Sequence, residues 1–214
     1  MIVRLQYISQ ENAGQTHLQA IKKALEAGCN WIQLRVKNQP EEKVLELALE
    51  ARKLCDAFSA KLIVNDFPQA ALQAKADGLH LGLQDMPVLQ ARAIVGNEMI
   101  IGGTANTFEH IRQRVAEGVN YIGLGPFRFT KTKEKLSPIL GLAGYEAIMQ
   151  QMHEAPITMP IIAIGGIELT DIAAIMQTGV YGVAVSGAIT HAENPVATVQ
   201  EMLAKTNSVY QQEY

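Results

Sequence analysis

Short apolar segments alternate with longer amphipathic segments along almost the whole chain. The short segments are nearly continuous runs of Val, Ile, Leu and Ala, which are typical of strands buried on both faces. The longer segments carry apolar residues three or four positions apart, which indicates helices with one buried face. The pattern predicts strands at residues 1–9, 31–37, 61–65, 78–81, 99–102, 121–125, 161–164 and 182–185.

A helix is expected after each of these strands. The clearest one covers residues 41–57, where Pro40 precedes a stripe formed by Val44, Ala48 and Ala51. The other expected helices lie at residues 17–27, near Gln69, and at 88–95, 107–117, 142–152, 169–177 and 195–204. Eight such β-then-α units favour a closed (β/α)8 TIM barrel, an α/β fold, over an open doubly wound sheet. We therefore predict one barrel domain over residues 1–205, with a polar, frayed tail at 206–214.

Composition and charge limit the classes of partner. The chain has 214 residues, of which 48% are hydrophobic and 18% charged, and this is enough for one sizeable core. A net charge of −3 gives no polyanion-binding surface, so nucleic acid is not an expected partner. No apolar run or leader segment suggests a membrane, so we expect a cytoplasmic protein, with homo-oligomerisation left open. Cys29 and Cys55 lie in or beside apolar segments and are expected to be buried free thiols.

Charged and amide side chains on the second strand are the first sign of a functional site. Gln33, Arg35 and Lys37 are spaced by two, so they point to one face of the pleat. Both faces of a barrel strand are expected to be buried from water. Burying an amide and two cations there costs desolvation free energy unless a ligand binds them near the mouth.

Two carboxylates follow the third and fourth strands. Asp66 comes directly after Asn65, and Asp85 follows the segment His80-Leu81-Gly82. At about 4 Å and an effective dielectric near 20, two carboxylates repel by roughly 4 kcal/mol, so a cation between them is expected, and Mg²⁺ prefers such hard oxygen ligands. The structural alternative is that each Asp caps the helix that follows it. His80 is interpreted as a core histidine.

Donors suited to phosphate lie on the later strands. The loop after Gly125-Pro126 carries hydroxyl and cationic groups, and residues 131–137 are polar enough to form a mobile lid. Glycine-rich turns after the seventh and eighth strands allow backbone N–H groups to approach an anion. The candidate phosphate-handling residues are Thr104, Thr130, Thr132, Lys133, Gly165, Gly166, Val185 and Ser186. The mouth would then have two separate anion-binding clusters. One is built by glycines near Gly165 and Ser186, and the other is cationic, with a metal, near Arg35, Lys37, Asp66, Asp85 and Lys133. Two phosphorylated small-molecule substrates fit this arrangement better than one.

Five short motifs together resemble the thiamine phosphate synthases over nearly the whole chain. The motifs are Gln33-Leu34-Arg35 with Lys37, Val64-Asn65-Asp66, His80-Leu81-Gly82 with Asp85, Gly123-Leu124-Gly125-Pro126 with Thr130, Thr132 and Lys133, and Ala163-Ile164-Gly165-Gly166-Ile167. The resemblance implies a (β/α)8 transferase of thiamine biosynthesis. Such an enzyme joins hydroxymethylpyrimidine diphosphate to hydroxyethylthiazole phosphate and releases pyrophosphate with the help of Mg²⁺.

The resemblance also implies a role for each candidate residue. Asp66 and Asp85 would hold the metal, and Gln33 would face the pyrimidine. The diphosphate would be held by Arg35, Lys37, Asn65, Thr104 and Lys133, of which Arg35, Lys37 and Lys133 are the catalytic candidates. The thiazole phosphate would be held by Thr130, Thr132, Gly166 and Ser186. A diphosphate leaving an electron-rich aminopyrimidine can depart before bond formation, so no protein nucleophile is needed.

The chain departs from the usual family pattern at several positions. Phe67 replaces an arginine, Leu83 a glutamine, Thr104 a serine and Asn106 a histidine, while Arg128-Phe129 replaces a more apolar pair with proline. Two alternatives remain: a thiazole tautomerase of the related branch, and a non-catalytic phosphate-ligand binding protein on the same barrel. A tautomerase would have no use for a carboxylate pair and a Thr-x-Thr-Lys loop.

Overall fold

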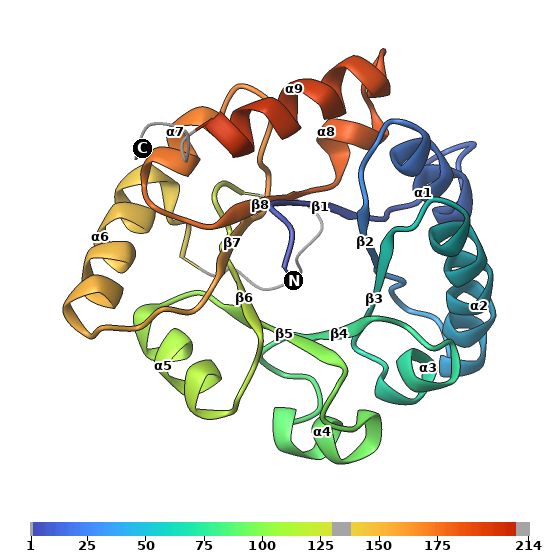
Figure 1. The fold of residues 1–214 in the computed structure, drawn as a ribbon, viewed down its shortest axis with the longest axis horizontal. Coiled ribbons are helices and arrows are strands. Elements are labelled where there is room, and N and C mark those ends of the chain that lie inside the picture. Colours follow the sequence, from blue (N-terminus) through green and yellow to red (C-terminus); the bar gives the residue numbers. More distant parts are fainter. Residues whose placement is uncertain (1, 130–137, 209–214) are drawn as a thin grey trace.

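A computed structural model describes residues 2–129 and 138–208 and shows a closed barrel of parallel strands in the order β1 to β8. Figure 1 looks into the ring of strands, with the helices outside it. The strands are β1 (Leu5–Ile8), β2 (Trp31–Leu34), β3 (Lys61–Asn65), β4 (Gly78–Leu81), β5 (Ile100–Ala105), β6 (Tyr121–Leu124), β7 (Ile161–Ile164) and β8 (Gly182–Val185). The predicted TIM barrel is confirmed.

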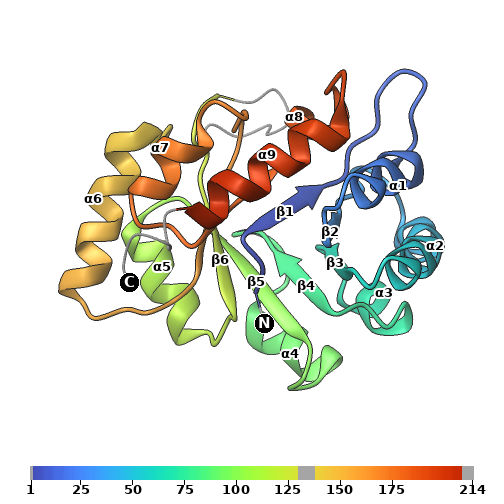
Figure 2. The same ribbon diagram turned by 45° about the horizontal axis from the view of Figure 1, so that its top comes forward.

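Helices cover the outside of the barrel, as the tilted view in Figure 2 also shows. They are α1 (His17–Glu26), α2 (Glu41–Ala57), α3 (Pro68–Gln73), α4 (Val88–Val95), α5 (Phe108–Ala116), α6 (Gly141–Glu154), α7 (Ile172–Gln177), α8 (Gly187–Thr190) and α9 (Pro195–Ser208). The four-residue α8 was not expected from the sequence. Among the described residues, no helix has the length and apolar character that crossing a membrane requires.

The core has two layers, separated by the strands. The larger cluster lies between the strands and the helices and contains both buried free thiols, Cys29 and Cys55, as expected. The smaller cluster fills the inside of the barrel and consists of Trp31, Ile63, Tyr121, Ile162 and Ala184. The rings of Trp31 and Tyr121 meet edge to face, with centroids 5.1 Å apart. The barrel interior is therefore packed.

Strand β2 is shorter than predicted and ends at Leu34. Its expected extension to residue 37 is wrong because the backbone N–H of Arg35 donates to the Ser9 hydroxyl group, at 3.1 Å, and Asn38 turns the chain with a φ of 56°. Arg35 and Lys37 therefore lie on the connection that leaves the barrel, and only Gln33 is on the strand. This places the two cations at the mouth, where water and ligands have access.

Strand β5 is longer than predicted and includes Gly102 and Gly103, which the sequence suggested were the end of the strand. Pairing with β6 continues through Thr104 and Ala105. A Cβ atom on Gly102 would lie 2.1 Å from the Tyr121 ring, and one on Gly103 would lie 2.8 Å from Arg114 Cδ. Both glycines are thus strand residues that give space to large neighbouring side chains, and Thr104 is delivered by the strand itself.

The last helix also runs further than predicted. Helix α9 continues to Ser208, past the expected domain boundary at residue 205, and Thr206 is completely buried. The expectation of a frayed tail is therefore wrong for residues 206–208, because the helix continues through them, and the hydroxyl groups of Thr206 and Ser208 donate to carbonyl oxygens one turn earlier. The expected lid at residues 131–137 and the tail from residue 209 lie outside the described residues.

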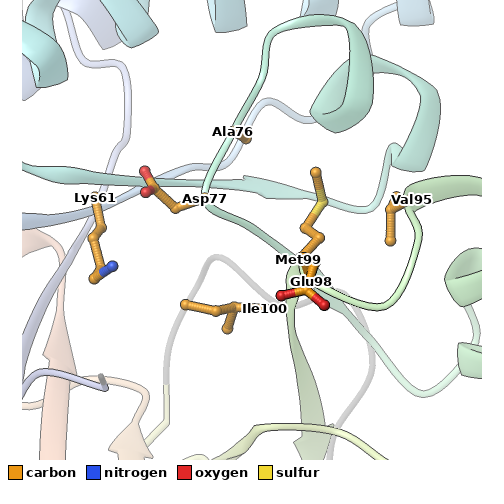
Figure 3. A pocket seen from close by; sticks show the side chains of 7 residues that line it. All are labelled: Lys61, Ala76, Asp77, Val95, Glu98, Met99 and Ile100. Carbon is orange, nitrogen blue, oxygen red and sulfur yellow. The ribbon is translucent and has the colours of Figure 1, made fainter.

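A shallow pocket lies at the amino-terminal ends of β3, β4 and β5, and Figure 3 shows the side chains that line it. Asp77 in this pocket accepts hydrogen bonds from Arg52 Nη1, at 2.6 Å, and from the Leu62 backbone N–H, at 2.8 Å. These contacts tie β3, β4 and α2 together. Asp77 therefore serves the fold, and none of the predicted site residues lines this pocket.

Candidate active site

The carboxyl ends of β2, β3 and β4 bring four charged side chains to one side of the barrel mouth. Lys37 Nζ donates to Asp66 Oδ2 at 3.0 Å, and the Lys37 side chain remains half exposed. The Asp85 carboxyl group is close enough to that of Asp66 to help raise its pKa. Arg35 lies close enough to both carboxylates for them to oppose the lowering of its pKa by burial. The predicted convergence of these residues is thus present.

The carboxylate pair is held under electrostatic strain. Burial and the neighbouring Asp85 raise the pKa of Asp66 to about 6, while Lys37 acts in the opposite direction. A buried carboxyl group next to a second one prefers its neutral form unless a cation compensates the charge. The donor set therefore fits a hard divalent cation. Among the described residues, no group of three or more acidic, His or Cys side chains forms, so a metal here would have two protein carboxylates and other oxygen ligands.

Neither aspartate has the capping role that the sequence left open. The residue preceding α3 is Phe67 and the one preceding α4 is Pro87, and neither helix start has a side-chain cap hydrogen bond. Asp85 Oδ2 instead accepts the Gly82 backbone N–H at 2.6 Å, within its own loop. Asp66 has a φ of 68°, and its N–H donates to the His80 carbonyl oxygen. The chain thus adopts an uncommon conformation to turn this carboxylate into the mouth.

Two amides lie side by side inside the mouth. Gln33 Nε2 donates to Asn65 Oδ1 at 2.7 Å, and both side chains are buried. This bond uses one donor and one acceptor, so Gln33 Oε1 remains an acceptor and Asn65 Nδ2 remains a donor. An aminopyrimidine ring offers the matching amino donor and ring-nitrogen acceptor. The pair is therefore suited to the pyrimidine that Gln33 was expected to face.

The opposite side of the mouth is built by the ends of β7 and β8. Gly165 and Gly166 have φ values of 95° and 71°, which side-chain-bearing residues rarely adopt. The side chain of Val185 lies in the outer core, so only its backbone can contribute to a ligand site. Ser186 Oγ donates to the Ile8 carbonyl oxygen at 2.7 Å, so its hydroxyl group must reorient before it can donate to a phosphate.

Arg128 supports the glycine turn instead of pointing into the mouth. Its Nη1 and Nη2 atoms pair with both Asp171 oxygens, at 2.7 and 2.8 Å, and Nη1 also donates to the Gly166 carbonyl oxygen at 2.8 Å. It therefore does not replace the anion-binding arginine that the family usually has at the position of Phe67. Phe67 itself packs against the outer core, and Leu83 is exposed. Asn106 is buried and donates from Nδ2 to the Gly125 carbonyl oxygen.

Sequence reasoning missed three residues that organise the site. His80 is a buried, hydrogen-bonded core histidine, as expected, but the sequence did not reveal its partners, which are Thr104 Oγ1 and the Tyr121 hydroxyl group, each at 3.0 Å. Arg114 is buried on α5 and contacts the carbonyl oxygens of Gly82 and Thr104. The signal for these contacts was the Gly102-Gly103 pair, which leaves space for a large residue on each face of β5. Thr130, Thr132 and Lys133 lie outside the described residues, so their roles stay predictions.

Known proteins match the chain over nearly its full length. The profile of the family described as thiamine monophosphate synthase covers residues 5–189. A thiamine-phosphate synthase of Flavobacterium johnsoniae is 53% identical over 205 residues, spanning 96% of this chain and 97% of that protein. One from Bacteroides thetaiotaomicron is 49% identical over 202 residues, spanning 94% and 97%. The solved thiamine phosphate pyrophosphorylase of Pyrococcus furiosus superposes with a TM-score of 0.84 at 29% identity, covering 96% of each chain.

Proposed function

The chain belongs to the thiamine monophosphate synthase family, and from this membership we propose that it joins 4-amino-2-methyl-5-hydroxymethylpyrimidine diphosphate to 4-methyl-5-(2-hydroxyethyl)thiazole phosphate, giving thiamine phosphate and pyrophosphate. The observation that carries the proposal is the meeting of Asp66 and Asp85 with Lys37 and Arg35 at one side of the mouth. Two carboxylates and two cations close together suit a metal-bound diphosphate, which brings its own negative charge and its own cation.

Asp66 and Asp85 would hold Mg²⁺. The raised pKa of Asp66 supports this assignment, because a bound cation removes the repulsion that raises it. When bound, the ion neutralises charge on the departing diphosphate. Lys37 and Arg35 then contact diphosphate oxygens directly, and charge-assisted hydrogen bonds of this kind are shorter and stronger than neutral ones. These residues stabilise the negative charge that grows as the C–O bond breaks.

The amide pair orients the pyrimidine. Because Gln33 Nε2 is fixed by Asn65, the free acceptor and donor of the pair point in set directions. A ring held by two hydrogen bonds presents its exocyclic carbon to the thiazole from one side only. Holding both reactants in this way lowers the entropic part of the barrier.

The thiazole phosphate is assigned to the β7–β8 side. Gly165 and Gly166 allow close approach of the backbone, and Arg128 fixes the Gly166 carbonyl group so that the turn keeps its shape. Thr130 and Thr132 are expected to add hydroxyl donors. The diphosphate of one substrate and the phosphate of the other are then bound on opposite sides of the mouth, with the reacting atoms between them.

The alternatives lack a comparable observation. A tautomerase that only isomerises a thiazole phosphate loses no diphosphate, so it has no use for two strained carboxylates beside two cations. A non-catalytic binding protein likewise gains nothing from the unfavourable Asp66–Asp85 contact, which destabilises the protein without a metal.

The test is a reconstitution assay with the purified chain, both substrates and Mg²⁺, monitoring thiamine phosphate and pyrophosphate together. We expect equal amounts of the two products, no product without the thiazole phosphate, and loss of activity in excess EDTA that added Mg²⁺ restores. Isomerisation of the thiazole phosphate without pyrophosphate release would support the tautomerase instead. Full activity in excess EDTA would contradict the assignment of Asp66 and Asp85 to a metal, but it would leave the proposed reaction standing.

A further inference from the structure

A chain of polar side chains runs from the mouth into the barrel interior. Thr104 Oγ1 lies 3.0 Å from His80 Nε2, and His80 Nδ1 lies 3.0 Å from the Tyr121 hydroxyl oxygen. His80 and Tyr121 are buried, whereas Thr104 is partly exposed at the mouth. Thr104 lies on β5 and is a candidate for binding the diphosphate. His80 on β4 and Tyr121 on β6 connect it with the base of the barrel. We call these three residues the Thr104–His80–Tyr121 chain.

Two glycines make room for this chain. Gly102 pairs with both His80 and Tyr121 in the sheet, and a Cβ atom there would lie 2.5 Å from the Tyr121 hydroxyl oxygen. Gly123 pairs with Thr104, and a Cβ atom there would lie 3.1 Å from His80 Cε1. Larger residues at either position would displace a member of the chain, so its geometry is built into the sheet.

The direction of donation along the chain decides what Thr104 can offer a ligand. If Tyr121 donates to His80 Nδ1, then Nε2 carries the proton and donates to Thr104 Oγ1, which leaves the Thr104 proton for the ligand. If the direction is reversed, Thr104 donates to His80 and turns only lone pairs toward the diphosphate. The second arrangement repels the anion.

The base of the chain favours the first direction. The Gln6 amide lies next to the Tyr121 hydroxyl group and opposes the rise in pKa that burial causes in this phenol. Gln6 is 1% exposed, and its Nε2 atom makes no well-formed hydrogen bond to any described residue. The phenol oxygen is an acceptor available to this buried, unpartnered amide N–H, and a phenol oxygen that accepts from Gln6 keeps its own proton for His80 Nδ1. Among the described residues, Thr104 Oγ1 has no hydrogen-bond partner other than His80.

We propose that His80 and Tyr121 are positioning residues that fix the imidazole tautomer and thereby keep the Thr104 hydroxyl proton available to the diphosphate. The inference rests on the proposed function, because Thr104 must contact the diphosphate. It adds two residues that do not themselves touch the substrate. Tyr121 sets the proton on His80 Nε2, and His80 sets the orientation of the Thr104 hydroxyl group.

The test is a double-mutant cycle with Tyr121→Phe, Thr104→Val and the double variant. The probes are the Kd of inorganic pyrophosphate in Mg²⁺, measured by calorimetry, and kcat for thiamine phosphate formation. Thr104→Val should weaken each by about tenfold or more, since it removes a hydrogen bond to a charged group. Tyr121→Phe should weaken each by about three- to tenfold alone, but by less than about twofold when Thr104 is already Val. A purely structural role of Tyr121 would give the same loss in both backgrounds and would overturn the proposal.

His80→Gln provides a second, independent variant. A glutamine amide has no tautomers, so its N–H can donate to Thr104 whether or not Tyr121 has a hydroxyl group. Adding Tyr121→Phe to His80→Gln should therefore change the pyrophosphate Kd by less than about twofold. A further loss equal to that of Tyr121→Phe alone would contradict the proposal, as would a wild-type protein that does not bind pyrophosphate. Pyrophosphate binding without thiamine phosphate formation would instead refute the proposed function and leave the cycle interpretable. Unfolding curves verify that each variant is folded.

Discussion

At the scale of single residues, the candidate site combines groups that would not be placed together for stability. Asp66 is the clearest case, because it has a positive φ, lies beside Asp85 and has its pKa raised to about 6. Each feature raises the energy of the folded, metal-free protein. Strain of this kind is expected where a ligand supplies the compensating charge.

Replacing Asp66 with Asn should stabilise the metal-free protein by about 1–3 kcal/mol above pH 6. The amide carries no charge to repel Asp85, and Asn adopts positive φ readily. The sign follows from the raised pKa: wild-type Asp66 takes up its proton at higher pH in the folded state than in the unfolded state. The advantage of the variant should therefore shrink as pH falls from about 6 to about 4. Urea unfolding at these pH values, without metal, measures it.

The matched control for this prediction is Asp77→Asn on the opposite face. Asp77 is satisfied by Arg52 and by the Leu62 N–H, so the amide should lower the unfolding free energy. Lower stability of Asp66→Asn at pH 7.5 would show that the Lys37 contact outweighs the carboxylate repulsion.

At the scale of elements, the site depends on a connection between α5 and two strand ends. Arg114 is 3% exposed, and its guanidinium group donates to the carbonyl oxygens of Thr104 and Gly82, at 3.1 and 2.7 Å, and pairs with Glu117. Gly82 in turn holds Asp85 through its N–H. A helix on the outside of the barrel thus fixes the positions of a hydroxyl group and a carboxylate in the mouth.

Arg114→Met should lower the unfolding free energy by about 2–4 kcal/mol, because it leaves two buried carbonyl groups and Glu117 without their partner. It should also raise the Mg²⁺ concentration needed for half-maximal activity, since the loop bearing Asp85 loses its anchor. Arg112→Met, exposed on the same helix, is the control and should change both quantities little. Equal effects of the two substitutions on Mg²⁺ dependence would argue against the proposed anchor.

At the scale of the whole molecule, the two faces of the barrel have different tasks. The amino-terminal face carries structural ion pairs such as Arg52–Asp77, whereas the carboxyl-terminal face carries strained carboxylates and glycine turns. Glycines with positive φ occur on both faces, for example Gly118 before β6 and Gly166 after β7. The same backbone requirement therefore has a structural role at one end and an expected binding role at the other.

Gly166→Ala and Gly118→Ala form a matched pair that separates these roles. Both put a Cβ on a left-handed residue, which costs roughly 1–2 kcal/mol of stability. Only Gly166→Ala should also raise KM for the thiazole phosphate, by about fivefold or more, because it hinders close approach of the backbone to the phosphate. KM for the pyrimidine diphosphate should stay nearly unchanged. Equal increases in both KM values would count against separate phosphate sites. Steady-state kinetics with each substrate varied in turn gives the answer.

The class of fold and most of the residues brought to the mouth could be predicted from the order of residues along the chain. Apolar runs such as Ile161–Ile164 identify buried strands because a strand covered on both faces has no polar alternation. Parallel strands place their carboxyl ends at one edge, so Gln33, Asp66 and Asp85 could be assigned to a common mouth from their order alone. Where the structure describes them, these residues lie there.

How these groups are paired and held depends on contacts between distant parts of the folded chain. The sequence could not place the end of β2 before Arg35, because the hydroxyl group of Ser9, just after β1, takes the N–H that would have continued the ladder. It could not show that Arg128 supports a turn, or that His80 joins Thr104 to Tyr121, because these contacts link residues far apart in the chain. The local sequence pattern indicates which residues are buried and which secondary structure they form. The hydrogen-bond partner of a polar side chain depends instead on which strands lie next to each other in the barrel.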